Sequence, residues 1–187
     1  MLKIYITLAY FVFLNLSAEV LKKLEVKGND RISSETVKVY GDITIGKDYS
    51  ASQINGVLKN LYDTDFFEDI KITLNNGVLN ILVKEYPIVN AVDLEGEKSN
   101  TVKKKILEKL NLKASESFIE NNLTQDVNLI KKIYSTIGFN FVSVEPKIEK
   151  FDDNRINLVY VLDKGKKTDI AEINFIGDKK IKDKRLR

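Results

Sequence analysis

Cysteine and histidine are both absent from this sequence of 187 residues, and only two prolines and one methionine occur. Without cysteine and histidine, the chain has no disulfides, no thiol nucleophile, no histidine base and few of the commonest zinc ligands. A site built from carboxylates alone stays open, but no phosphate-binding glycine loop or metal-ligand pattern accompanies it. We therefore expect no cofactor, no metal and no enzymatic reaction, and a fold stabilised by packing alone.

A large excess of charge of either sign is also missing. The chain has 30 lysines and arginines against 27 acidic residues, a net charge of +3, which is too small to indicate a nucleic-acid partner. The C-terminal stretch GDKKIKDKRLR is locally basic, and we interpret it as the solvated face of an interrupted helix. The sequence therefore predicts no binding of nucleic acid.

The apolar run at the N-terminus, from Ile4 to Leu16, is shorter than the ~20 residues of a membrane-spanning helix. It follows the basic Lys3 and ends in Leu-Ser-Ala before a change to charged sequence. This order is typical of a secretory signal peptide, with cleavage expected between Ala18 and Glu19. An uncleaved N-terminal anchor is the alternative interpretation.

Three glycines mark an internal repeat, because each follows a stretch of alternating apolar and polar residues. The stretches are LEVKGNDRI at residues 24–32, VDLEGEKSN at 92–100 and EINFIGDKKI at 172–181. Gly28 and Gly96 lie 68 residues apart (96 − 28), and Gly96 and Gly177 lie 81 apart (177 − 96). These periods are too long for a solenoid and suit small domains in tandem. We interpret the three glycines as structural turns.

The first unit predicts the element order β-α-α-β-β. A strand over residues 21–27 leads to a helix capped by Ser33, with Tyr40 facing inward. Ser50 and Gln53 have the spacing of a capping box for a second helix. Alternation over residues 70–74, a turn at Asn76-Gly77 and an apolar run over residues 78–83 then predict a hairpin.

The second unit repeats this order. Ser117 and Glu120 have the spacing of a second capping box, and a long helix follows with Ile137 on its inward stripe. Gly138 is expected to end that helix, and Pro146 predicts an edge or a bulge in the next strand.

These patterns predict an α+β fold of tandem β-α-α-β-β domains, each a three-stranded sheet covered by two helices. The expected boundaries are residues 1–18 for the signal peptide, 19–86 for the first domain, 87–165 for the second and 166–187 for the start of a third.

The same order resembles the POTRA domains of BamA-like outer membrane protein assembly factors. The resemblance rests on NLYDTDFFEDIKITL at residues 60–74, LVKEYPIVNAVDLEG at 82–96, IYSTIGFNFVSV at 133–144 and INLVYVLDKGKKTDIAEINFIGDKKI at 156–181. It implies a platform on the periplasmic face of the outer membrane. This platform would receive unfolded outer-membrane proteins, dock accessory lipoproteins and meet periplasmic chaperones. Family members continue into a C-terminal barrel, so we expect a fragment whose membrane association runs through that missing part.

The resemblance and the fold together indicate where an unfolded client would bind. A three-stranded sheet has two edges with unpaired backbone groups, to which an extended segment can add as a further strand. The second strand of each unit is expected at such an edge. The predicted client-binding residues are Glu68, Asp69, Ile70, Lys71, Ile72, Thr73 and Leu74 in the first unit and Val142, Ser143, Val144 and Glu145 in the second.

Three other functions remain open at this point. One is the POTRA region of a related barrel for secretion or autotransporter assembly. Another is a cell-division protein with a single anchor and a POTRA domain, which requires an uncleaved and longer anchor. The third is a carboxylate enzyme, for which Asp65, Glu68 and Asp69 are candidates. We interpret these three carboxylates as solvating the start of a strand.

Overall fold

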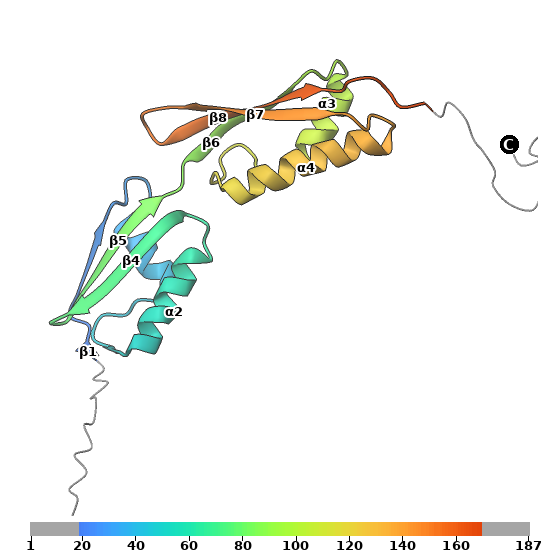
Figure 1. Ribbon diagram of the computed structural model, residues 1–187. Coiled ribbons are helices and arrows are strands. Elements are labelled where there is room, and N and C mark those ends of the chain that lie inside the picture. Colours follow the sequence, from blue (N-terminus) through green and yellow to red (C-terminus); the bar gives the residue numbers. More distant parts are fainter. Residues whose placement is uncertain (1–18, 170–187) are drawn as a thin grey trace, which may run out of the picture. The chain divides into compact units, whose positions relative to one another are not determined.

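The structure is a computed structural model that describes residues 19–169 (Figure 1). The expected signal peptide with Ala18 and the third glycine, Gly177, lie outside the described residues. The described residues divide into two compact units, which meet in the sequence between Tyr86 and Pro87.

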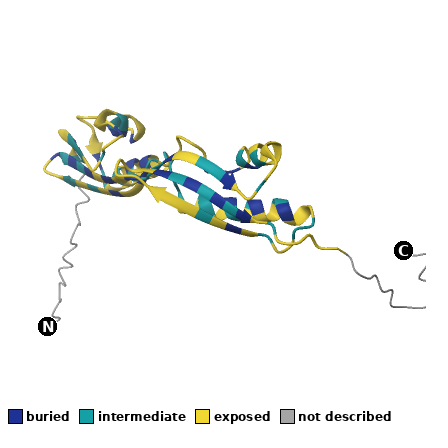
Figure 2. Ribbon diagram, turned by 90° about the horizontal axis from the view of Figure 1, so that it is seen from above, coloured by how far each residue is buried: buried dark blue, intermediate teal, exposed yellow. Residues whose placement is uncertain are grey.

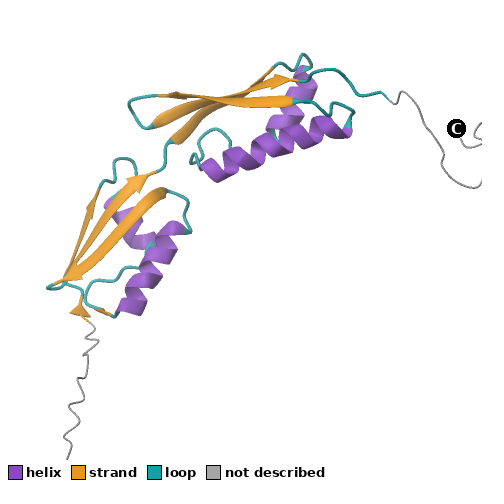
Figure 3. Cartoon of the chain, in the orientation of Figure 1, coloured by secondary structure: helices purple, strands orange, loops and turns teal. Residues whose placement is uncertain are grey.

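Unit 1 contains a three-stranded sheet with two helices on one of its faces (Figure 3). Its elements are β1 (Glu19–Val20), β2 (Lys23–Lys27), α1 (Ser34–Tyr40), β3 (Asp48–Tyr49), α2 (Ala51–Tyr62), β4 (Phe67–Asn75) and β5 (Val78–Glu85). The strand order is β2-β5-β4, with β2 parallel and β4 antiparallel to the central β5. The two-residue strands β1 and β3 pair separately, which the sequence patterns did not predict.

Unit 2 has the same topology. Its elements are β6 (Ile88–Glu95), α3 (Asn100–Leu107), α4 (Glu120–Thr136), β7 (Ser143–Lys150) and β8 (Arg155–Asp163). The strand order is β6-β8-β7, again with the first strand parallel and the second antiparallel to the central one. The predicted α+β class, with β-α-α-β-β units, is therefore confirmed.

The helix starts show which local signals decide the fold. Ser33 caps α1 by accepting from the Thr36 amide, and Ser50 and Gln53 form both halves of a capping box on α2. The predicted box at Ser117 is wrong, because α4 begins after Ile119 without a side-chain cap. Ser117 instead forms a β-bridge with Ile88 at the sheet edge. The backbone of Ser117 is therefore extended and belongs to the sheet, so this residue does not cap the helix.

Each unit buries its own core between the helices and one sheet face, which Figure 2 marks as dark blue positions alternating along the strands. Val37, Leu61 and Ile81 belong to the first core, and Ile130 and Tyr160 to the second. Tyr40 and Ile137, both expected inward, are each 52% exposed. Both stand at the C-terminal end of a helix, where the apolar stripe extends past the edge of the core.

The glycine repeat has a steric cause. Gly28 and Gly96 follow β2 and β6 with φ of 80° and 88°, a region that side chains other than glycine rarely adopt. A Cβ at Gly28 would lie 2.1 Å from the Val83 carbonyl oxygen, and one at Gly96 would lie 2.0 Å from the Leu162 oxygen. The chain therefore crosses the end of the central strand at a distance that no side chain permits.

Candidate functional site

The outer edge of β4 is the first candidate site. β4 pairs only with β5 among the described strands, and it carries the predicted residues 68–74. Ile70 is buried and Ile72 and Leu74 are half-buried on the core face, whereas Lys71 and Thr73 are exposed. The strand therefore offers a backbone edge beside alternating apolar and polar side chains.

The main-chain directions along β4 follow from one hydrogen bond. The Ile70 amide donates to the Tyr62 hydroxyl at 3.2 Å, so the main-chain groups of Ile70 turn away from β5. Backbone groups of alternate residues point the same way in a strand, so those of Ile72 and Leu74 also turn outward. No hydrogen bond within residues 19–169 reaches the outward amides of Ile72 and Leu74.

The charged side chains at the start of β4 lie beside lysines rather than beside one another. Glu68 forms an ion pair with Lys84 at 2.7 Å, and Asp69 with Lys71 at 3.7 Å. Burial, together with the negative charges of Glu68 and Asp65, raises the pKa of Tyr86. An acid–base pair needs two carboxylates whose environments differ strongly, and these exposed ion pairs do not supply that.

The outer edge of β7 is the second candidate, and it differs from β4 in one position. Its Pro146 pairs with Tyr160 of β8, and Tyr160 stands two residues before Leu162 in the same strand. Ile72 pairs with Ile81 of β5, two residues before Val83. Because Val83 and Leu162 both abut the glycine turn, Ile72 and Pro146 occupy the same place in the two sheets. Pro146 has no amide hydrogen, so β7 lacks a donor where β4 has one.

The remaining predicted residues of unit 2 are only partly available to a partner. Val142 precedes β7, and Val144 is buried in the core, while Ser143 and Glu145 are exposed. The side chains of Ser143 and Glu145 are exposed, but their main-chain amides and carbonyls point towards β8. These groups are therefore already hydrogen-bonded within the sheet. The outward main-chain groups belong to Val144, Pro146 and Ile148.

The opposite edge of unit 2 is partly covered. The Val89 amide donates to the Glu116 carbonyl at 2.9 Å, and the Ser115 amide donates to the Val89 carbonyl at 2.7 Å. The Phe118 amide also donates to the Pro87 carbonyl at 2.7 Å. The loop before α4 therefore occupies the first half of the β6 edge, which leaves β7 as the more open edge of this sheet.

Sequence patterns missed a buried carboxylate that joins the end of β5 to the loop after Gly28. Glu85 accepts from the Ile32 amide at 2.7 Å and from the Arg31 amide at 3.1 Å. The Arg31 guanidinium lies 3.6 Å from the same carboxylate. Glu85 thus satisfies the backbone of the loop that leads into α1, and its role is structural.

Unit 2 holds its corresponding loop through Glu97. This carboxylate lies 2.7 Å from the Lys164 ammonium and accepts from the Tyr134 hydroxyl at 2.5 Å and from the Ser99 amide at 2.9 Å. Burial would raise the pKa of Glu97, but these donors outweigh it and lower the pKa to about 2. Burial and the bond to Glu97 raise the pKa of Tyr134.

A third carboxylate, Asp126, lies fully buried on α4. It accepts from the Asn111 amide at 2.7 Å, the Leu112 amide at 2.9 Å and the Tyr160 hydroxyl at 3.1 Å. Burial and the charge of Asp126 raise the pKa of Tyr160. Every partner of Asp126 is internal, so this group fixes the α3–α4 loop to the sheet. Helical spacing could have found it, because Asp126 lies three residues after Leu123 and four before Ile130, on the inward face of α4.

Two kinds of site are absent from the described part of the chain. Residues 19–169 contain no group of three or more acidic side chains placed to hold a metal ion. Within the same range, every helix is too short or too polar to pass through a lipid bilayer.

The comparisons with known proteins agree with this architecture. Residues 87–165 match the family model of POTRA, described as the surface antigen variable number repeat. The outer membrane protein assembly factor BamA of Neisseria meningitidis serogroup B (strain ATCC BAA-335 / MC58) is 30% identical over 168 residues, which are 89% of this chain and 21% of that protein. BamA of Neorickettsia risticii (strain Illinois) is 24% identical over 172 residues, which are 91% of this chain and 23% of that protein.

A solved structure has the same fold. It is the N-terminal domain of Omp85 from the thermophilic cyanobacterium Thermosynechococcus elongatus, with a TM-score of 0.50 and 17% identity. The match covers 77% of this chain and 63% of that one.

The family match defines residues 87–165 as a POTRA domain, and unit 1 repeats the topology and the glycine turn of that domain. The alignments to two BamA proteins indicate a BamA-like POTRA segment. The chain spans about a fifth of the length of these curated relatives. Both relatives are outer membrane protein assembly factors.

Proposed function

We propose that this chain is the POTRA region of an outer membrane protein assembly factor on the periplasmic face of the outer membrane. In this proposal it receives unfolded outer-membrane proteins by strand addition and docks accessory lipoproteins. The likeness to proteins named as assembly factors supports the process, and the open sheet edges support the mode of binding.

The outer edge of β4 carries the proposal. Its outward amides at Ile72 and Leu74 can donate to an incoming strand, and their carbonyls can accept from it. Main-chain hydrogen bonds of this kind tolerate many side-chain sequences, which suits a receptor for varied clients. The apolar side chains of Ile72 and Leu74 alternate with Lys71 and Thr73, so an added strand with alternating polarity would continue both faces of the sheet.

The β7 edge is the second receiver in this proposal, with Ser143, Val144 and Glu145 in its first half. Its outward register is interrupted at Pro146, so an added strand forms fewer main-chain hydrogen bonds there. We therefore expect clients to bind β4 more tightly than β7.

Titration of the ¹⁵N-labelled chain with a strand peptide tests the proposal. The peptide is about ten residues long and alternates apolar and polar residues, as membrane strands do. Amide shifts should concentrate in residues 68–74 and, at higher peptide concentration, in residues 143–150. Ile72→Pro removes the outward donor without removing a bond to β5, and should weaken binding at β4 about five- to tenfold.

Ile72→Ala is the matched control, since it shortens the side chain and keeps the amide. It should retain most of the binding at β4. Shifts spread over α1 and α2 would contradict strand addition, and so would an equal loss of affinity in the alanine and proline variants.

A further inference from the structure

The region of the first helix in unit 2 has an unusual charge for this chain. From the glycine turn to the second helix, unit 2 has six lysines and three glutamates over residues 97–119, a net charge of +3. The corresponding residues 29–50 of unit 1 have three basic and four acidic side chains, a net charge of −1. The two segments have the same place in the same fold, so the topology does not require the lysines of unit 2.

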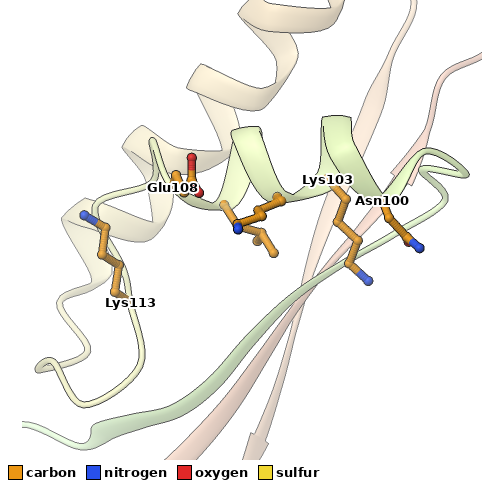
Figure 4. Close-up of a pocket in the computed structure, with 6 residues that line it drawn as sticks. Asn100, Lys103, Glu108 and Lys113 are labelled. Atoms are coloured by element: carbon orange, nitrogen blue, oxygen red, sulfur yellow. The ribbon is translucent and has the colours of Figure 1, made fainter.

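Some of these lysines surround a hollow on the surface of unit 2. The hollow has a volume of about 510 Å³, and Figure 4 shows Asn100 and Lys103 at one end and Glu108 and Lys113 at the other. Lys104 and Leu107 complete the lining, which is mostly apolar. Leu107 and the hydrocarbon stems of the lysines supply apolar walls, because lysine side chains place only their ammonium groups in water.

The lysines of the hollow differ in their partners. The Lys103 ammonium lies 2.5 Å from the Asp93 carboxylate on β6, so it is held against the sheet. Lys104 and Lys113 form no ion pair with any residue between 19 and 169. Apart from the Lys103–Asp93 pair, the lining has the ammonium groups of Lys104 and Lys113 and the carboxylate of Glu108, a net charge of +1. This excess of positive charge beside apolar walls is complementary to carboxylates that alternate with apolar side chains.

An anionic membrane surface fits this region less well than a polypeptide does. Helices that bind membranes insert an exposed apolar face into the lipid. The α3 helix has eight residues, with Ile106 buried and Leu107 half-buried, so Val102 at 38% exposure is its one exposed apolar side chain in the described structure. The helix has no apolar face to insert, whereas the hollow has room for apolar side chains of a polypeptide.

We propose that the hollow over α3, lined by Lys104, Leu107 and Lys113, is a docking site for an acidic, extended polypeptide segment of a partner protein. Apolar side chains of the partner lie in the hollow, and neighbouring carboxylates meet Lys104 and Lys113. This site is separate from the β4 and β7 edges and goes beyond the client binding proposed above.

A fluorescein-labelled peptide of about ten residues, with glutamate alternating with leucine, serves as the probe for the purified chain. We expect saturable binding by fluorescence anisotropy, with amide shifts in α3 and in residues 108–113. The double variant Lys104→Gln/Lys113→Gln should weaken binding about tenfold, as expected for two lost ion pairs at an apolar site. The double variant Lys131→Gln/Lys132→Gln removes the same charge from α4 and should leave binding unchanged.

Each other outcome overturns the proposal. Equal weakening by the α3 and α4 variants would mean attraction to net charge alone. Undiminished binding of a peptide with glutamine in place of glutamate would remove the role of the ammonium groups. Absence of peptide binding would also overturn it, and binding to phosphatidylglycerol vesicles that depends on Lys104 and Lys113 would make lipid the ligand. The double variants keep the buried residues of unit 2, and a wild-type amide spectrum outside α3 verifies their fold.

Discussion

The two units of this chain use ion pairs of opposite orientation at the same place in the fold. In both, the loop after the glycine must be held to the end of the central strand. Unit 1 places the carboxylate on the strand side, at Glu85, and unit 2 places it on the loop side, at Glu97. Glu85 and Lys164 each stand two residues after the carbonyl that abuts the glycine turn. Both units therefore have an ion pair at this place, with the positions of the carboxylate and the cation exchanged.

The surfaces proposed for binding also differ between the two units. Unit 1 has an outward amide at Ile72 of β4, where unit 2 has Pro146 in β7. Unit 2 has the lysine-lined hollow over α3, where the first helix region of unit 1 is slightly acidic. A shared fold thus carries two different surfaces that we propose as binding sites, an open backbone edge in unit 1 and a basic hollow in unit 2.

The largest expected effect comes from the feature that the units share. Gly28→Ala places a methyl group about 2 Å from the Val83 oxygen, and we expect it to lower the free energy of unfolding of unit 1 by about 3 kcal/mol or more. Gly46→Ala is the control, because Gly46 has φ of 87° with no atom near its Cβ position. It should cost only about 1 kcal/mol.

Urea unfolding followed by amide hydrogen exchange in β5 measures both variants. Similar losses for Gly28→Ala and Gly46→Ala would mean that positive φ alone, and not the contact with the central strand, explains the repeated glycine.

Acid should weaken unit 2 through Glu97. The pKa of this carboxyl is about 2 in the folded chain against an ordinary value of 4.5. A lowered pKa stabilises the fold above the ordinary value, and this stability is lost as the pH falls from about 5 through 2. This difference in pKa corresponds to at most about 3 to 4 kcal/mol of the free energy of unfolding.

The difference between the chain and its Glu97→Gln variant isolates this contribution. The free energy of unfolding, measured from hydrogen exchange in β8, should differ most near pH 7 and converge towards pH 2. Curves that stay parallel over this range would show that Lys164 and Tyr134 do not hold Glu97 in its charged form.

Whether a contact could be predicted from the sequence depends on how far apart its residues lie along the chain. The Ser33 cap and the Ser50–Gln53 capping box involve neighbours in sequence, and both were predicted from spacing alone. The Glu85–Arg31 and Glu97–Lys164 contacts join residues more than about 50 positions apart, and no local pattern indicates them. Ser117 shows the same limit, since its local capping signal lost to pairing with the distant Ile88.

The same distinction between local and distant contacts applies to the candidate sites. The alternation over residues 70–74 predicts a half-buried strand, and Pro146 predicts an edge or a bulge, because each signal depends on the backbone of its own strand. The structure has the edge, since β7 pairs with β8 without a register shift. The hollow over α3 could not be predicted, since it depends on how Leu107 and Lys113 are brought together by the loop fixed to Asp126.

The smallest expected effect comes from making β7 resemble β4. Pro146→Ile restores the outward amide at the place that Ile72 occupies in unit 1, and should strengthen binding of the strand peptide at β7 about fivefold, the value of one main-chain hydrogen bond. Pro146→Ala gives back the amide with a smaller side chain, so a similar gain in both variants assigns the effect to the backbone. A gain only with isoleucine would assign it to the side chain and argue against strand addition as the source of affinity. Amide shifts in residues 143–150, followed during the titration, measure the change at β7 separately from binding at β4.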